Sequence, residues 1–224
     1  MENTLQSICV LRLSAIGDIC NAVAAVQAIQ RQHPEAKVTW IIGKIEKVLL
    51  EGLPGVEFIV FDKSQGRGAF KQLKKDLKGK QFDVLLHMQV ALRAKWAARI
   101  ILAKRKIGFD WQRAKELHAL FTNERIKKQS HAHVLEGFFA FAEKLGVPES
   151  AKRNLSWNIP VSETDKAFAD QHICSEQKTL VIAPAASKEE RNWLAERYAA
   201  MADYAHEQGF KVVLCGGPAA IDKQ

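Results

Sequence analysis

The chain has 224 residues, of which 47% are hydrophobic and 26% charged, so it can bury a core and is not globally disordered. Its formal net charge of +8 indicates an anionic partner, and leaves open nucleic acid, a membrane surface or a phosphorylated small molecule. The N-terminus carries no signal-peptide pattern, no run reaches the roughly 20 apolar residues of a membrane span, and the four cysteines are scattered. We therefore expect a cytoplasmic protein with reduced thiols and no disulfide framework.

Short apolar runs alternate with amphipathic stretches over the first 150 residues. Strands are predicted over 8–13, 37–42, 56–61, 82–87 and 105–109, and helices over 18–31, 46–51, 69–77, 92–103 and 134–145. This alternation predicts an α/β fold with a parallel sheet that is covered by helices on both faces.

A second series of elements follows residues 151–160, which we interpret as a crossover or linker. It comprises a helix over 163–173, a strand over 179–183, a helix over 192–208 and a strand over 211–215. So few elements leave much of a sheet uncovered and do not make an independently folding domain. We predict a first domain over 1–160 and a partial second one over 161–224, and favour a fragment of a two-domain protein over an extension of the first sheet.

The loop after the first strand, Ser14-Ala15-Ile16-Gly17-Asp18, is the first candidate site. Parallel α/β proteins bind ligands at the carboxyl ends of strands, against helix N-termini. Gly17 allows a tight turn and the close approach of another backbone. Asp18 has two interpretations. It is either a helix cap worth roughly 1 kcal/mol, which position alone favours, or a carboxylate base at the mouth of an interdomain cleft.

The loop that precedes the helix over 192–208 is the second candidate site. Ser187 offers a hydroxyl, and Lys188 and Arg191 offer positive charge near a helix N-terminus, which suits a diphosphate. The alternative is a solvated first turn with local ion pairs, and this is the better interpretation of the loop by itself.

Three strand-linked motifs together resemble a known family. They are R-L-S-A-I-G-D, P-A-A-S-K-E-E-R-N-W and V-V-L-C-G-G-P, and segments 86–94, 107–110 and 133–136 agree in order and spacing. In these motifs, across nearly the whole chain, the sequence resembles the ADP-heptose:lipopolysaccharide heptosyltransferases. The resemblance implies a GT-B architecture, in which two Rossmann-like domains face a cleft. The first domain would bind the lipid A–inner-core acceptor and the second a nucleotide-activated heptose, ADP-heptose in this family.

The resemblance also implies roles for individual residues in an inverting transfer that needs no metal and no cofactor. It makes Asp18 the catalytic base, in place of a cap. The residues implied in donor-phosphate binding are Ser187, Lys188 and Arg191. The residues implied in acceptor binding are Ser14, Gly17, Arg93, Arg113 and Lys115. The family continues well beyond 224 residues, so we expect an incomplete donor pocket and leave open whether this chain is active.

Positive charge is concentrated in the first domain. Residues 63–80 hold seven Lys and Arg against one acidic residue, and residues 91–128 hold eleven against three. These residues form solvated helix faces or attract anionic lipopolysaccharide precursors at the inner membrane, where we expect peripheral contact. A nucleic-acid-binding domain is the rival from another class, but the sequence has no helix-turn-helix, RNA-binding or zinc pattern, so we expect no nucleic-acid partner. A non-catalytic module that binds a glycolipid or a nucleotide sugar is the other alternative.

Histidine and tryptophan residues outside these motifs are expected to be structural. His131 and His133 are two residues apart and do not share a helix face, so they do not predict a metal site. We expect Trp111, Trp157 and Trp193 to pack against the protein and not against a nucleotide base.

Overall fold

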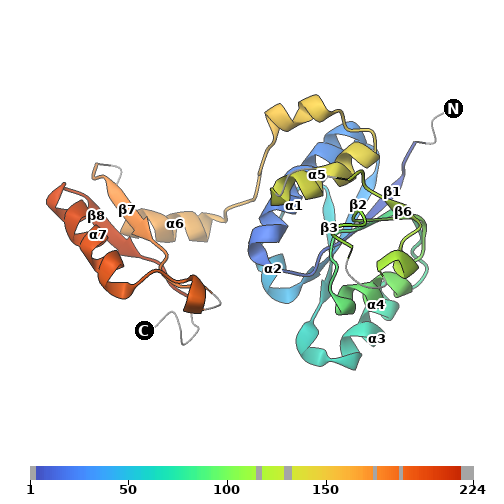
Figure 1. Cartoon of the computed structure of the whole chain (residues 1–224), viewed down its shortest axis with the longest axis horizontal. Coiled ribbons are helices and arrows are strands. Elements are labelled where there is room, and N and C mark those ends of the chain that lie inside the picture. The colour runs from blue at the N-terminus through green and yellow to red at the C-terminus, as the bar shows by residue number, and fades with distance from the viewer. Residues whose placement is uncertain (1–3, 115–117, 129–132, 174–175, 187–188, 218–224) are drawn as a thin grey trace. The chain divides into compact units, whose positions relative to one another are not determined.

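The computed structural model describes residues 4–114, 118–128, 133–173, 176–186 and 189–217, and the chain divides into two compact units, Met1–Pro160 and Val161–Gln224. The first unit is built on a parallel six-stranded sheet with the strand order β3-β2-β1-β4-β5-β6 (Figure 1). The strands are β1 (Ser7–Leu11), β2 (Lys37–Gly43), β3 (Val56–Phe61), β4 (Phe82–His87), β5 (Ala103–Gly108) and β6 (Glu124–Arg125). The predicted α/β class with a parallel sheet is confirmed, whereas the two-residue strand β6 was not predicted.

Helices cover both faces of this sheet (Figure 1). On one face lie α1 (Ile16–Gln32) and α5 (Val134–Lys144), and on the other lie α3 (Arg67–Asp76) and α4 (Leu92–Ile100). The short helix α2 (Lys44–Leu49) directly follows β2, and 3-10 turns form at η1 (Lys63–Gln65), η2 (His118–Phe121) and η3 (Glu149–Asn154).

The central strand β1 shows why the sheet needs cover on both sides. Its residues Ile8 to Leu11 are fully buried, and successive side chains of a strand point to opposite faces. Ile8 and Val10 therefore pack in the cluster that contains α1 and α5, while Cys9 and Leu11 pack in the cluster that contains α3 and α4. A continuous apolar run is the pattern of a strand buried on both faces.

The segment after α5 is not a free linker. The Trp157 indole Nε1 donates to the carbonyl of Cys20 at 2.9 Å, and Arg31 Nη1 donates to Ser156 Oγ at 2.8 Å. These bonds tie the segment to α1, so residues up to Pro160 belong to the first unit. Trp157 packs at the surface, as predicted. The N-terminus of α5 is capped by His133, whose ring accepts from Leu135 N at 3.2 Å, while His131 lies outside the described residues.

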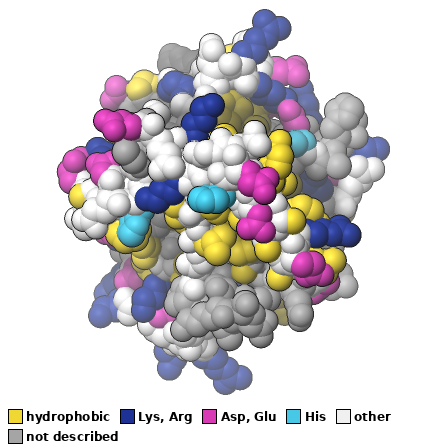
Figure 2. Space-filling model, turned by 90° about the vertical axis from the view of Figure 1, so that its left-hand side faces the viewer, with side chains coloured by type: hydrophobic (Ala, Val, Ile, Leu, Met, Phe, Trp, Pro, Cys, Tyr) yellow, Lys and Arg dark blue, Asp and Glu magenta, His cyan; other side chains and the backbone are white. Residues whose placement is uncertain are grey.

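The second unit consists of α6 (Glu163–His172), β7 (Thr179–Ile182), η4 (Glu189–Arg191), α7 (Ala195–Glu207) and β8 (Lys211–Leu214). Strands β7 and β8 pair in parallel as a sheet of their own, so the alternative in which they extend the first sheet is wrong. Among the described hydrophobic residues of this unit, only Ile182 and Ala205 are buried. Figure 2 shows a face on which hydrophobic side chains are exposed between charged ones.

Several helix boundaries differ from prediction, and two of them bear on function. Helix α1 begins at Ile16, two residues earlier than predicted, so Asp18 lies inside its first turn. Helix α7 begins at Ala195, three residues later than predicted, because residues 192–194 between η4 and the helix are not helical. Within the described part of the chain, no helix is both long enough and apolar enough to cross a membrane.

Candidate active site

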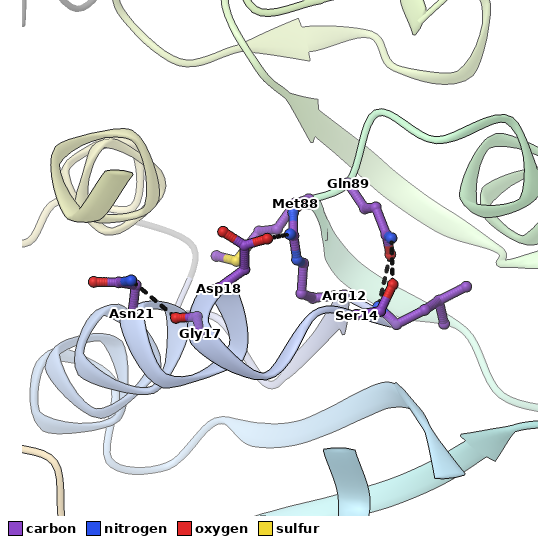
Figure 3. A network of polar contacts seen from close by, with 8 residues as sticks. Arg12, Ser14, Gly17, Asp18, Asn21, Met88 and Gln89 are labelled. Carbon is purple, nitrogen blue, oxygen red and sulfur yellow. Dashed lines mark hydrogen bonds and ion pairs between the residues drawn. The ribbon is translucent and has the colours of Figure 1, made fainter. Parts of the chain in front are cut away.

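An ion pair lies at the carboxyl end of β1. Arg12 follows the strand directly, and its guanidinium pairs with the carboxylate of Asp18 (Figure 3). Its other terminal nitrogen, Nη1, donates to the carbonyl of Met88 at 2.7 Å, and its guanidinium carbon lies 5.2 Å from the ring centroid of Phe138. The Arg12 side chain is 11% exposed and the Asp18 side chain 37% exposed. The pair therefore holds a carboxylate in a fixed orientation while leaving it open to solvent and to a ligand.

The buried member of the pair remains a cation. Burial lowers the pKa of Arg12 below its usual value, and the charge and hydrogen bond of Asp18 oppose this effect. A guanidinium stays protonated throughout the physiological range. Since a helix N-terminus also carries partial positive charge, the Asp18 carboxylate is flanked by positive charge on two sides.

The interpretation of Asp18 as a helix cap is wrong. The cap of α1 is Ala15, whose side chain makes no capping hydrogen bond, and Asp18 is the third residue of the helix. Its described polar contact is with Arg12, which follows β1. The carboxylate is thus positioned by a side chain at the strand end.

Gln89 joins the loops that follow β1 and β4. Its Oε1 accepts from Leu13 N at 2.7 Å, and its Nε2 donates to Ser14 Oγ at 3.1 Å. Parallel pairing brings these loops to one edge of the sheet, with Leu11 opposite His87. Figure 3 shows Asp18 on one side of Arg12 and Ser14 on the other. The ion pair and the Ser14 hydroxyl therefore belong to one continuous edge.

A hollow of about 440 Å³ opens at this edge. It is lined by residues that follow β1, β2, β3 and β4 in turn. The polar ones are Ser14, Lys44, Glu46, Asp62, Lys63, Ser64, Gln89 and Arg93. Three cations, two carboxylates and two hydroxyls suit a ligand that carries both hydroxyls and negative charge. Asp18 is not among the lining residues and stands beside the hollow.

Close packing at Gly43 shapes the floor of the hollow. A Cβ at this position would overlap both the Leu13 carbonyl oxygen and the Glu46 carboxylate. The Gly43 N–H donates to the same Leu13 carbonyl at 3.0 Å. Glycine therefore lets α2 begin directly at the strand end, and this places the buried Glu46 side chain against the hollow.

The predicted acceptor-binding residues fall in different places. Arg93 lies exposed in the first turn of α4 and lines the hollow together with Ser14. Gly17 lies in the first turn of α1, and a Cβ there would meet nothing within 4 Å, so the predicted close approach of another backbone is not found among the described residues. Arg113 packs against Gly137 of α5 and does not line the hollow, and Lys115 lies outside the described residues.

Of the three predicted donor-phosphate residues, the structure describes only Arg191. Arg191 is exposed at the end of η4, four residues before α7 begins, so it lies near the N-terminus of that helix but outside it. Ser187 and Lys188 lie outside the described residues. The loop is closed by Asn192, whose Oδ1 accepts from Ala186 N at 2.6 Å. Trp193 packs edge-on against Tyr198, with ring centroids 5.3 Å apart, as expected for a packing role.

Sequence reasoning missed Arg12, Gln89 and Glu46. The signal for Arg12 was present, because a cation directly after a wholly apolar strand stands at the ligand-binding edge of a parallel sheet. Nothing in the sequence marked Gln89 or Glu46, whose roles depend on the neighbouring loops. Across the described residues, no cluster of three or more His, Cys, Asp or Glu side chains is placed to hold a metal ion.

Comparison with known proteins identifies the family. The sequence profile of glycosyltransferase family 9 (heptosyltransferase) matches residues 70–224, and the chain belongs to this family. The lipopolysaccharide core heptosyltransferase OpsX of Haemophilus influenzae is 46% identical over 214 residues, which are 96% of this chain and 61% of OpsX. The chain thus spans about three fifths of the length of this curated relative.

Solved structures show the same fold. A family 9 glycosyltransferase from Veillonella parvula matches with a TM-score of 0.78 and 21% identity, over 97% of this chain and 64% of that one. The Escherichia coli heptosyltransferase WaaC with ADP-2-deoxy-2-fluoro heptose matches with a TM-score of 0.72 and 20% identity, over 95% and 70%. The predicted GT-B-type fold and the family resemblance are both confirmed.

Proposed function

We propose that this chain is the acceptor-binding domain and the first part of the donor-binding domain of a lipopolysaccharide heptosyltransferase. The enzyme would transfer heptose from ADP-heptose to a lipid A–inner-core acceptor in the cytoplasm. The observation that carries the proposal is the Asp18 carboxylate, held by Arg12 beside a polar hollow, in a chain of family 9. The identity to a relative named as a lipopolysaccharide core heptosyltransferase supports the substrate class.

In this proposal the hollow binds the acceptor saccharide. Lys44, Lys63 and Arg93 attract its phosphates and carboxylates, and the Ser14 hydroxyl accepts a hydrogen bond from Gln89 while its own proton is available to a sugar oxygen. The acceptor hydroxyl would then lie at the edge of the hollow next to Asp18.

The reaction is a single displacement with inversion. Asp18 accepts the proton of the acceptor hydroxyl while that oxygen forms a bond to the anomeric carbon of the heptose. The bond from the anomeric carbon to the phosphate oxygen breaks on the opposite face, and ADP leaves with the electron pair. Arg12 keeps the carboxylate oriented towards the acceptor during this step.

The second unit would hold the donor. Arg191, with Ser187 and Lys188, would stabilise the charge on the departing diphosphate. The E. coli WaaC structure contains an ADP-heptose analogue, which supports a nucleotide-activated heptose as the donor.

The first unit would meet the inner membrane at its basic surface. Helix α3 exposes Lys71, Lys74 and Lys75, and Lys78 follows it, all on the side of the sheet that carries α4. Lysines near an anionic bilayer each contribute about 1 kcal/mol of attraction. Such peripheral contact would bring the protein to a lipid-anchored acceptor.

The test combines transfer with binding. The full-length protein, with its complete donor-binding domain, is incubated with ADP-heptose and de-acylated inner-core saccharide, and ADP release and the extended saccharide are measured. Saccharide-dependent ADP release supports the proposal. Saccharide binding without release favours the non-catalytic module, and salt-sensitive binding of DNA or RNA with no saccharide binding favours the nucleic-acid alternative.

A further inference from the structure

A second hollow lies at the carboxyl ends of β5 and β6. It has a volume of about 350 Å³ and is lined by Asp110, Trp111, Gln112, Arg125, Ile126 and Lys128. Its two walls are held together by the parallel pairing of Gly108 with Arg125. Ile126 N also donates a hydrogen bond to the Gly108 carbonyl at 3.0 Å. None of its lining residues lines the hollow beside Asp18.

Asp110 forms a buried wall of this second hollow. It is 4% exposed, and its Oδ1 accepts from the backbone N–H groups of Gln112 at 2.9 Å and Arg113 at 3.2 Å. Its other oxygen, Oδ2, is buried and has no hydrogen-bond partner within the described part of the chain. Buried carboxylate oxygens are costly to leave unpaired, so an exception at a hollow points to a ligand that supplies the missing donor.

Arg125 has a buried donor without an acceptor among the described residues, just as Asp110 has a buried acceptor without a donor. Its guanidinium carbon stacks 3.6 Å from the ring centroid of Trp111, and its Nη1 is buried without an acceptor among the residues described. Trp111 is 75% exposed, so its indole can move without opening a void in the core. Such a movement would uncover the Arg125 guanidinium to a molecule in the hollow, and the exposed Lys128 adds a second cation at the rim.

These groups define the chemistry of the ligand. The unpaired Asp110 oxygen can accept from a donor such as a hydroxyl, and Arg125 with Lys128 favours a phosphate or carboxylate. The indole of Trp111 offers a flat apolar face next to them. A sugar ring that bears an acidic substituent offers hydroxyls to Asp110, a negative charge to the two cations and an apolar ring face to Trp111. Inorganic phosphate leaves the apolar face unused, and a neutral sugar leaves the cations without a counter-charge.

We propose that this second hollow binds an acidic sugar ring of the acceptor, different from the ring that receives the heptose. The assignment of that ring to the acceptor rests on the proposed function, while the chemistry of the hollow does not. Because this hollow lies at β5 and β6 and the first one at β1 to β4, the two sites would bind separate rings along one saccharide.

The test is calorimetric binding to the 224-residue chain. The probes are de-acylated inner-core saccharide, glucose 6-phosphate, glucuronic acid, glucose and inorganic phosphate. We expect the two acidic monosaccharides to bind more tightly than glucose or phosphate. Asp110→Asn, Arg125→Gln and Trp111→Ala should each weaken binding of the acidic probes and of the inner-core saccharide tenfold or more. Arg99→Gln, an exposed control on α4 that lines neither hollow, should bind like the parent chain.

A stability measurement separates binding from folding. Asp110→Asn keeps an Oδ1 acceptor for the two backbone N–H groups and removes the unpaired carboxylate oxygen, so its unfolding midpoint should not fall. Unchanged affinity in all three variants, or no binding of any acidic saccharide, would overturn the proposal. Glucose 6-phosphate that binds more tightly than the inner-core saccharide would overturn the assignment to the acceptor.

Transfer assays distinguish this inference from the proposed function. If the parent protein transfers heptose and the three variants keep its acceptor KM, the second site is wrong and the function stands. If the variants lose saccharide binding while the full-length enzyme, with its complete donor-binding domain, shows no transfer, the site stands and the function is wrong.

Discussion

Replacing Asp18 by asparagine separates a catalytic role from a purely structural one. The side chain keeps its shape and an oxygen that can accept from Arg12, but it loses its charge and its ability to take a proton. Because Asp18 is 37% exposed, the structural loss is that of a partly solvated ion pair, about 1 kcal/mol. Arg12 keeps its bond to the Met88 carbonyl, so the guanidinium is not left without a partner.

The expected catalytic loss is much larger than the structural one. Removal of a general base costs about 10²- to 10⁴-fold in rate, which corresponds to about 3–5 kcal/mol of activation free energy. We therefore expect Asp18→Asn to lose nearly all transfer while its acceptor affinity and free energy of unfolding change little. ADP release, calorimetric saccharide binding and denaturant unfolding measure the three quantities.

A matched control is Asp76→Asn, which makes the same chemical change on α3. Asp76 accepts a hydrogen bond from Gln72 at 2.7 Å and lines neither hollow. It should retain both transfer and stability. Near-normal transfer by Asp18→Asn, with a loss of stability alone, would show that Asp18 only orders the loop and would refute the catalytic assignment.

Three further perturbations follow from the geometry. Arg93→Gln should weaken binding of the inner-core saccharide severalfold and leave the free energy of unfolding unchanged, because the side chain is exposed in the first hollow; unchanged affinity in calorimetry would remove it from the site. The Lys104 ammonium and two backbone N–H groups lower the pKa of Asp83 from 3.8 to about 2, so its stabilisation is present above pH 3.8 and is lost as the pH falls towards 2. Asp83→Asn should therefore cost about 1–2 kcal/mol of unfolding free energy at pH 7 and progressively less below pH 4, and a pH-independent difference in denaturant midpoints would contradict this. Gly43→Ala should destabilise the first unit by about 1–3 kcal/mol, because its Cβ overlaps the Leu13 carbonyl oxygen; an unchanged thermal midpoint would show that the loop adapts freely.

The local elements were predictable because their signals are local. The apolar run of β1 and the amphipathic spacing of α1 lie within stretches of a few turns, and the alternation of such stretches predicts a parallel sheet covered on both faces. Boundaries were less accurate where a 3-10 turn precedes a helix, as at Arg191. There the geometry of the turn, and not hydrophobic periodicity, decides where the helix begins.

The sequence also indicated the sheet edge at which the candidate site lies, because in a parallel sheet the carboxyl ends of all strands lie on one side. It thereby placed Ser14, Asp18 and Arg93 at one edge of the sheet, and its motifs identified the family. It did not reveal how these residues are held. The contacts that do so join distant parts of the chain, such as Arg12 to Met88, 76 residues apart, and Gln89 to Ser14, 75 residues apart.

The sequence by itself determined the fold class, the family and the sheet edge that carries the candidate site, since each depends on patterns within short segments. Only the tertiary structure decided which side chains meet there. The strand order places β4 beside β1 and β6 beside β5, and this order alone pairs Arg12 with the Met88 carbonyl and brings Arg125 and Asp110 to one hollow. Strand order is set by packing over the whole sheet, and no local stretch of sequence encodes it.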